Sequence, residues 1–293
     1  MKEVNKMEKR ILLFGAIFIT VCLIGVYLLI PIPQTEKNEE KMGVVVSILP
    51  QAEFVEKIGG NKVQVIVMVP PGASPHTYEP IPSQLKEVSK AKMYAKVGSG
   101  IEFESAWMDK IISVNKEMRV VDCSKGIEFI EKEGHTDPHI WLSPKNAEIM
   151  VENIYQGLTQ IDPANQEYYA RNKEKYLQEL NKLDNEIAQA LSGKKNRKIM
   201  VYHPAWAYFA RDYGLEQIPI EKEGKEPTPQ GITSLIKQAR ENNIEVIFAS
   251  PQFSTKTAEV IAEEINGKVV LISPLEKNYL ENMRKVAEVF ARV

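Results

Sequence analysis

Residues 162–193 read DPANQEYYARNKEKYLQELNKLDNEIAQALSG, and this segment is the longest helical pattern in the chain after residue 43. Asp162 suits a helix N-cap, Pro163 the first helical position and Gly193 the position just past the helix end. About 28 helical residues reach roughly 42 Å, so we expect one stiff helix that runs along more than a single lobe. The apolar side chains of this helix recur at steps of three, four and seven residues, with polar residues on the opposite face: Tyr169, Tyr176, Leu180, Leu183, Ile187 and Leu191.

Short β-branched runs alternate with polar or helical segments on both sides of this helix, a pattern typical of βαβ units and parallel sheets. Before the helix these runs are Val44–Ile48, Val63–Met68, Met93–Val97 and Arg119–Val121. After the helix they are Ile199–Tyr202, Gln217–Ile220, Val246–Ala249 and Val269–Ile272. The sequence therefore predicts an α/β protein with two parallel-sheet lobes, 44–161 and 194–293, joined by the helix at 162–193.

The first 43 residues differ from the remainder. Ile11–Ile30 is a run of twenty residues without a charge, which is long enough to cross a bilayer, and basic residues within 1–10 precede it. The positive-inside rule places the basic segment 1–10 in the cytoplasm and the folded part outside. We expect a transmembrane anchor at 11–30 and a polar linker at 31–43. A cleaved signal peptide, or a lipoprotein signal at Cys22, is the alternative.

Composition excludes several classes of protein. With 44% apolar residues in a chain of 293, a sizeable core can form and a disordered chain is excluded. The 37 Lys and Arg residues are balanced by 39 Asp and Glu residues, whereas nucleic-acid binders are usually basic, so we expect no nucleic-acid partner. The two cysteines, Cys22 and Cys123, exclude a disulfide framework. We expect a monomer.

The histidines carry the chemistry. Of the four in the chain, His76 lies in a proline-rich loop after a strand, His203 directly follows a strand, and His139 lies in the stretch Asp137–Leu142. Ligands of parallel sheets gather at the carboxyl ends of strands, and neutral imidazole is the commonest zinc ligand. Together these features suggest that His76, His139 and His203 form a metal site. Because they are 63 and 64 residues apart, no short spacing rule supports the assignment.

Together with several further motifs, these residues resemble the zinc- and manganese-binding solute-binding proteins of ABC metal importers, the TroA-like or adhesin-like class. The resemblance covers residues 44–293 and implies two α/β lobes joined by one rigid helix, with Zn²⁺ or Mn²⁺ in the cleft. It also implies that His76, His139 and His203 are ligands and that an ABC transporter permease is the partner. The motifs that carry it are Val44–Pro50, Gly72–Glu79, Asp137–Leu142, Ala205–Phe209, Pro251–Phe253, Pro274, Leu275, Tyr279 and Met283.

The chain departs from this family in two places. Many members carry a carboxylate as fourth ligand before the Pro-Leu pair near the C-terminus, where this chain has Ser273. We therefore expect water, or a carboxylate of the loop Glu221–Glu226, at the fourth position, and a preference for zinc over manganese. Zinc importers also often carry a long His-rich acidic loop, which is reduced here to a short segment with His135, an exposed auxiliary residue.

The surroundings of the site are less specific. A ligating imidazole usually donates its other N–H to a carboxylate or carbonyl, which makes Asp137 a candidate partner of His139 and Glu79 of His76. Asp137 serves equally well as a turn residue. Four aromatic residues could exclude water from the cleft or simply belong to the core: Trp141, Trp206, Tyr208 and Phe209.

Three functions are consistent with these residues. The leading one is an extracytoplasmic, membrane-anchored binding protein, not an enzyme, that captures Zn²⁺ and delivers it to an ABC permease. A zinc-dependent hydrolase could also use three histidines and an open position, but it would need a general base, and Asp137 and Glu79 are the only carboxylates that a motif places near the histidines. The third is an adhesion protein in which the metal is structural.

Overall fold

The computed structural model describes residue 7 and residues 41–132, 134–222 and 224–293. The chain divides into two units, Met1–Glu40 and Lys41–Val293, and every helix and strand of the fold that the structure describes belongs to the second unit. The expected anchor at 11–30 lies outside the described residues, as do residues 1–10 apart from Met7. Within the described part of the chain, no helix is long and apolar enough to span a membrane.

The first lobe is built on a four-stranded parallel sheet with the order β2-β1-β3-β4. Val44, Val45 and Val46 of the central strand β1 are fully buried, as expected of a strand covered on both faces. The strands are β1 (Met42–Val46), β2 (Val63–Val67), β3 (Met93–Lys96) and β4 (Arg119–Asp122). The helices of this lobe are α2 (Leu49–Gly59), α3 (Pro82–Val88), α4 (Glu102–Val114) and α5 (Pro144–Ile161).

The second lobe repeats the plan with the parallel order β10-β9-β7-β8. In each lobe the chain passes from its first strand to one side of the sheet and then to the other, which opens a crevice at the carboxyl ends of the two central strands. The strands are β7 (Lys198–Val201), β8 (Glu216–Pro219), β9 (Val246–Ala249) and β10 (Lys268–Leu271). The helices are α7 (Ala207–Tyr213), α8 (Pro229–Glu241), α9 (Lys256–Glu264) and α10 (Tyr279–Ala291).

The expected α/β architecture of two parallel-sheet lobes and a long helix is therefore confirmed, with strand ends that differ from the sequence expectation by one or two residues. One element was not expected. The strands β5 (Glu131–Lys132) and β6 (His135–Thr136) form an antiparallel hairpin just before His139. Two-residue strands carry too little hydrophobic pattern to be recognised in a sequence.

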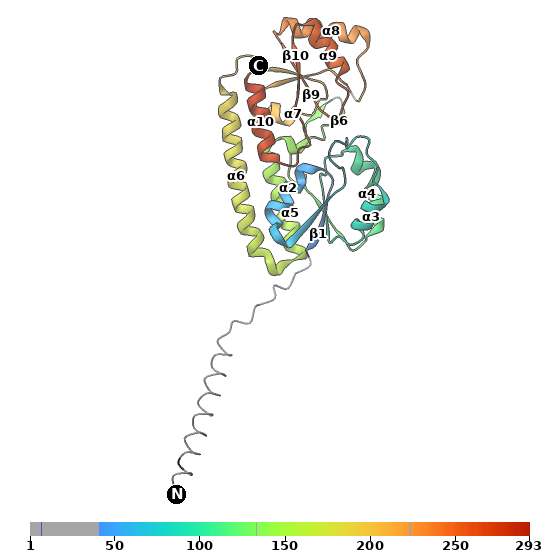
Figure 1. Cartoon of the computed structure of the whole chain (residues 1–293), viewed down its shortest axis with the longest axis vertical. Coiled ribbons are helices and arrows are strands. Elements are labelled where there is room, and N and C mark those ends of the chain that lie inside the picture. Colours follow the sequence, from blue (N-terminus) through green and yellow to red (C-terminus); the bar gives the residue numbers. More distant parts are fainter. Residues whose placement is uncertain (1–6, 8–40, 133, 223) are drawn as a thin grey trace. The chain divides into compact units, whose positions relative to one another are not determined.

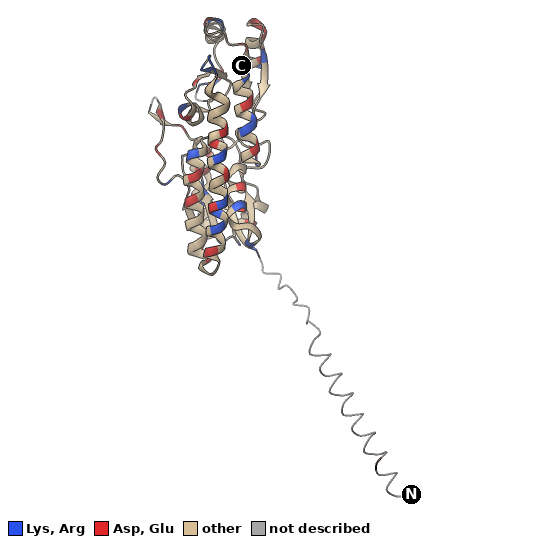
Figure 2. Cartoon of the chain, turned by 90° about the vertical axis from the view of Figure 1, so that its left-hand side faces the viewer, with Lys and Arg blue, Asp and Glu red and all other residues tan. Residues whose placement is uncertain are grey.

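The long helix α6 (Gln166–Ser192) buries the stripe of side chains that the sequence predicts, from Tyr169 to Leu191. It lies beside α2 and α5 of the first lobe and beside α10 of the second, so it runs along both lobes (Figure 1). Basic and acidic residues are interspersed along the helices on this side (Figure 2).

The helical segment begins at Pro163 with Asp162 as its N-cap, as expected, but its first residues, Pro163–Asn165, form a 3₁₀ turn. The α-helix α6 therefore begins three residues later than expected, at Gln166, and Asp162 is also the residue that follows the end of α5. The Asp162 carboxylate accepts hydrogen bonds from the Asn165 side chain (2.8 Å) and the Tyr169 hydroxyl (2.5 Å), which hold this turn between the two helices. The predicted end is correct, since Gly193 directly follows the last helical residue.

Direct hydrogen bonds also join the two lobes. The Trp141 indole donates to the Pro274 carbonyl (2.8 Å), and the Tyr208 hydroxyl donates to the Asp137 carbonyl (2.9 Å). At the other side of the junction, the Glu53 carboxylate accepts from the backbone N–H of Tyr279, the first residue of α10 (2.6 Å). The lobes are therefore connected through side chains as well as through α6.

Candidate metal centre

His76 lies in the loop that follows β2. Prolines restrict the backbone of this loop, and Gly72 adopts a left-handed conformation (φ 81°) where the chain turns. The carbonyl of Pro75 accepts a hydrogen bond from the backbone N–H of Phe103 in the first turn of α4 (2.9 Å). The residue before His76 is thus attached to a helix rather than left free in solvent.

His139 and His203 are also held in place by hydrogen bonds of their neighbouring backbone. His139 directly precedes the 3₁₀ turn Ile140–Leu142 that leads into α5, and Asp137 Oδ1 accepts its backbone N–H (2.9 Å). His203 lies two residues past the end of β7, at the carboxyl edge of the second sheet. The loop after β8 is tied to the same place, because the Glu221 N–H donates to the Tyr202 carbonyl (2.9 Å).

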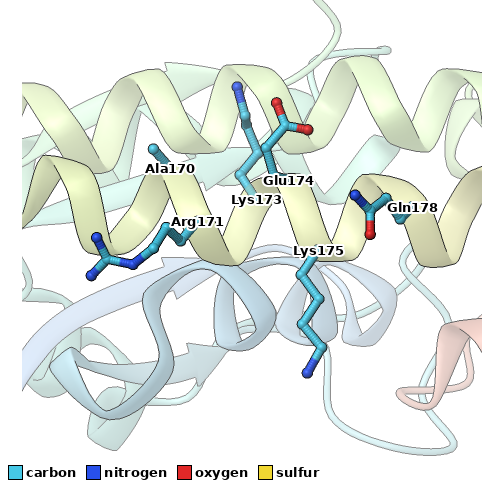
Figure 3. A pocket seen from close by; sticks show the side chains of 6 residues that line it. All are labelled: Ala170, Arg171, Lys173, Glu174, Lys175 and Gln178. Carbon is cyan, nitrogen blue, oxygen red and sulfur yellow. The ribbon is translucent and has the colours of Figure 1, made fainter.

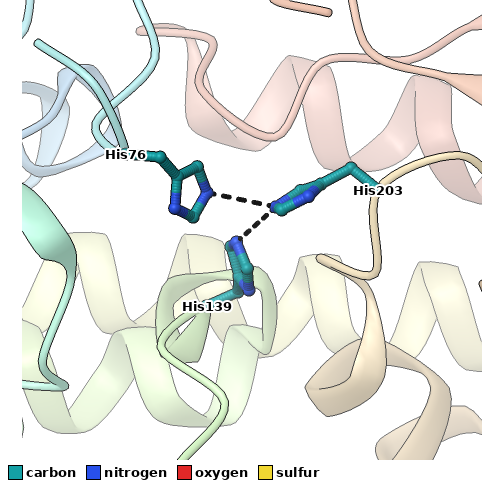
Figure 4. Close-up of side chains that lie close together, drawn as sticks. All are labelled: His76, His139 and His203. Atoms are coloured by element: carbon teal, nitrogen blue, oxygen red, sulfur yellow. Dashed lines mark hydrogen bonds between the residues drawn. The ribbon is translucent and has the colours of Figure 1, made fainter. Parts of the chain in front are cut away.

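The three imidazoles converge at one point between the lobes (Figure 4). His203 Nε2 lies 3.2 Å from His76 Nε2 and 3.1 Å from His139 Nε2. All three potential ligand atoms lie within 4.8 Å of one another. The three residues that the sequence selected are therefore brought together. The His139 and His203 side chains are 6% and 9% exposed, and that of His76 is 20% exposed.

The opposite nitrogen of each ring contacts a carboxylate. The Nδ1 atoms of His76, His139 and His203 lie 2.7 Å from Glu102, 3.0 Å from Asp137 and 3.2 Å from Glu221. The expectation for Asp137 is thus confirmed. The expectation that Glu79 partners His76 is wrong, because Glu102, 26 residues away from His76, occupies that position.

Sequence reasoning overlooked Glu102 and Glu221 as imidazole partners, although one signal was available for Glu221. It lies two residues past β8, so the strand-end rule that selected His203 applies to it as well. Glu102 has no comparable signal, because the first turn of a helix is a common place for an acidic residue whatever its role.

The arrangement is suited to a cation. A carboxylate only accepts hydrogen bonds, so in a neutral ring the Nδ1 atom carries the hydrogen and Nε2 is left as a bare acceptor. Three acceptors that face one another need a positive charge between them. Nitrogens bound tetrahedrally to zinc at 2.0–2.1 Å are about 3.4 Å apart, close to the two shortest separations here. The residues therefore fit one zinc ion.

Charges around the site favour the same conclusion. Burial is the largest influence on the pKa of His203 and lowers it; the Glu221 hydrogen bond opposes this, and the other two rings add to the lowering. The pKa lies below its ordinary value, so this ring is neutral at pH 7. Burial raises the pKa of Glu102, but its hydrogen bond to His76 and its electrostatic attraction to that ring together outweigh burial and leave the pKa below its usual value. Glu102 is therefore ionised.

The small pocket that contains the three histidines is lined by both lobes. Phe253 of the second lobe stacks on the His203 ring, with centroids 4.7 Å apart, and Trp141 lies 5.4 Å from His139. Of the four aromatic candidates, only Trp141 lines the described pocket. The other three, Trp206, Tyr208 and Phe209, are buried in the core.

The expected sources of a fourth protein ligand have other partners. The Ser273 hydroxyl accepts the backbone N–H of Leu275 (3.2 Å). Glu221 contacts His203 Nδ1, on the far side of the ring, and Glu226 accepts hydrogen bonds from the hydroxyls of Tyr202 and Thr257. Glu223 lies outside the described residues. His135 is exposed in the β5–β6 hairpin and is not part of the three-histidine cluster.

A second hollow on α6 has a different character. Its charged side chains, including Arg171 and Lys175, point in different directions (Figure 3). Lys173 pairs with Glu152 at 2.9 Å. The side chains diverge instead of converging, as on an ordinary solvated helix face, and offer no set of ligands.

Two α/β lobes, each with a parallel sheet, lie along one helix, and three imidazoles converge in the cleft between them. These features define a metal-binding protein of the two-lobed solute-binding class. Residues 44–293 match the family described as zinc-uptake complex component A, periplasmic. The chain belongs to this family, which serves metal uptake and not catalysis.

Relatives agree with this membership. The chain is 44% identical to a protein described as ZnuA in its crystal structure, with a TM-score of 0.85 over 87% of this chain and 99% of that one. It is 30% identical to the high-affinity zinc uptake system protein ZnuA of Bacillus subtilis, over 82% of this chain and 81% of the relative. The laminin-binding protein Lmb of Streptococcus agalactiae, described as having adhesin and metal-transporting activity, is 27% identical, with a TM-score of 0.79 over 86% of this chain and 99% of that one.

Proposed function

We propose that this chain captures one Zn²⁺ ion through the Nε2 atoms of His76, His139 and His203 and delivers it to the permease of an ABC importer. One observation carries the proposal: three imidazole Nε2 atoms face one another while a carboxylate contacts the opposite nitrogen of each ring. Such partners fix the tautomer and orientation of ligating histidines and increase their basicity.

Zinc suits this set of ligands better than manganese. Imidazoles suit zinc, whereas manganese prefers carboxylate and carbonyl oxygens, and the carboxylates here contact Nδ1 atoms. We assign the fourth position to water, since Glu221 and Glu226 are engaged elsewhere. A weakly held fourth ligand leaves one position at which an acceptor site can begin to take over the ion.

A hydrolase or a purely adhesive protein is less well supported. The carboxylates that contact the histidines, Glu102, Asp137 and Glu221, each bind an imidazole Nδ1, so none of them is free to act as a general base at the open position. Family membership favours uptake over both alternatives.

Delivery would be helped by attachment to the membrane. We propose that residues 11–30 anchor the chain and that residues 31–43 link the anchor to a monomeric binding unit, made of lobes 44–161 and 194–293 and the helix 162–193. A tethered donor meets its permease at a raised effective concentration. Mass spectrometry of the membrane-bound protein would support this with an N-terminus at or near Met1. A lipid-modified N-terminus at Cys22 would contradict it.

Elemental analysis tests the binding function. The full-length protein, purified without added metal and then titrated, should hold one zinc per chain. Manganese as the preferred ion would contradict the zinc assignment, and a protein that binds neither ion would contradict the proposed site.

A further inference from the structure

The first turn of α4 contacts the His76 loop in two places. Glu102 lies 2.7 Å from the His76 imidazole, and the Phe103 N–H donates to the carbonyl of Pro75 (2.9 Å). The Glu102 side chain is 58% exposed. Solvent, rather than packing, surrounds much of it, so its position depends on the backbone of α4.

Glu104, in the same turn, points the other way, into the sheet. It is 6% exposed and accepts the backbone N–H groups of Val97 (2.6 Å) and Gly98 (2.9 Å), directly past the end of β3. It also accepts the hydroxyl of Ser47, directly past the end of β1. One buried carboxylate thus joins α4 to the carboxyl ends of both central strands.

The donors around Glu104 are themselves fixed. Ser47 donates to Glu104, so the Tyr94 hydroxyl, 2.9 Å from the Ser47 hydroxyl, donates to Ser47. Gly98 adopts a left-handed conformation (φ 84°), and a Cβ there would lie 1.9 Å from an oxygen of Asp122. A buried carboxylate only accepts hydrogen bonds and needs donors around it. The backbone and hydroxyl groups that donate to Glu104 are held in fixed positions.

We propose that Glu104 is a positioning residue for the metal centre: it fixes the first turn of α4 against the sheet and thereby holds Glu102 and the Pro75 carbonyl where His76 needs them. This inference rests on the proposed zinc-binding function. Glu104 touches neither the imidazoles nor the ion, and it acts through the helix that carries Glu102.

The substitution Glu104→Gln tests this proposal. An amide keeps the size of the side chain but replaces one acceptor oxygen by a donor, so at least one of the fixed donors loses its partner. We expect zinc affinity to fall about tenfold. Removing a carboxylate that contacts a ligating histidine directly typically lowers metal affinity about 10- to 100-fold, and Glu104 acts indirectly, so the lower figure applies. The His76 ring should also be less often in the tautomer that carries the hydrogen on Nδ1, and more often in the one that carries it on Nε2. ¹⁵N-histidine spectra of the metal-free protein would report this, with four histidines to assign.

The control is Asp162→Asn. The Asp162 carboxylate also accepts a hydroxyl (Tyr169, 2.5 Å) and an N–H (Asn165 side chain, 2.8 Å), but it lies at the end of α5 away from His139 and not in α4. This variant should lose stability without changing the His76 signals or the zinc affinity. Combining Glu104→Gln with Glu102→Gln should lower affinity by less than the product of the separate losses, because both act on the same ring.

Parent-like affinity and parent-like His76 signals in Glu104→Gln would overturn the proposal, as would an equal loss of affinity in Asp162→Asn. If Glu104→Gln does not fold, Ser47→Ala removes one donor and should weaken affinity about twofold to threefold with the same change at His76; an unchanged ring would again overturn the proposal. Failure of the zinc-binding function itself would look different, because the parent protein would then bind no zinc.

Discussion

Each histidine of the site uses its two ring nitrogens differently. Nδ1 contacts a carboxylate, so we assign the ring hydrogen to Nδ1, and Nε2 faces the other two rings. We predict that Asp137→Ala weakens zinc binding about 10- to 100-fold, because Asp137 fixes both the ring and the backbone N–H of His139. Glu79→Ala is the control, since Glu79 is exposed and Glu102 is the partner of His76. Equal zinc affinities of the two variants in competition titrations would refute this role.

These partners show how far the site could be predicted. Asp137 was predictable because it lies two residues from its histidine, so a local turn brings the two together. Glu102 and Glu221 are 26 and 18 residues from theirs, and only the packing of α4 and of the β8 loop places them. The ligands could be selected as strand-end histidines, but their convergence depends on how the two lobes meet.

We expect the residue at position 273 to influence metal selectivity. We predict that Ser273→Asp tightens binding and shifts the preference toward Mn²⁺, because a charged oxygen ligand would be added to the open position. Ser273→Asn introduces a side chain of the same shape as aspartate but without the charge, and it should leave the preference unchanged. Zinc and manganese competition titrations of both variants decide the point. An aspartate variant with the parent's zinc-to-manganese ratio would show that residue 273 does not reach the ion.

Protons should compete with zinc. Neutral imidazole binds the metal, so zinc affinity should fall as the pH falls through about 6.5, the ordinary histidine value. The pKa of His203 is lowered by burial, so this ring should stay neutral to a lower pH than an ordinary histidine. Its protonation should therefore weaken zinc binding only at more acidic pH. Titrations at several pH values between 5 and 8 would test this. Affinity that does not change over this range would exclude imidazole ligands.

Among the elements, α6 is the one that the sequence described best. Its buried stripe follows from hydrophobic periodicity, which is a local property. Asp162 is the N-cap that Asp-Pro predicts, but contacts of Asp162 with Asn165 and Tyr169 stabilise a 3₁₀ turn there, so the α-helix begins only at Gln166. Local signals thus identified the helix, and tertiary contacts determined where it begins.

The buried face of α6 should contribute to stability and not to binding chemistry. We predict that Leu183→Ala, at a fully buried position, lowers the free energy of unfolding by about 2–5 kcal/mol. Lys182→Ala, at a side chain that is 73% exposed, should change it by less than about 0.5 kcal/mol. Chemical denaturation of both variants tests this, and zinc affinity should stay at the parent value in each. A large loss of affinity in Leu183→Ala would instead mean that α6 controls the cleft.

At the scale of the folded unit, the lobes are held by α6 and by hydrogen bonds such as Trp141–Pro274 and Glu53–Tyr279. A hinged binding protein with flexible linkers closes over its ligand by a large rotation. Here we predict a small tilt or a rearrangement of the metal loops when zinc binds. X-ray scattering with and without zinc should give nearly the same radius of gyration. A large closure would contradict the role of α6 as a rigid connection.

We expect three histidines from separate segments, His76, His139 and His203, to hold one zinc ion together. The most direct test is a zinc competition titration of the parent and of His76→Ala, His139→Ala and His203→Ala, with circular dichroism to confirm folding. We predict one site per chain in the parent and a loss of affinity by orders of magnitude in each variant, with the fold intact. A folded variant that keeps the parent's affinity would remove that histidine from the site and contradict this expectation.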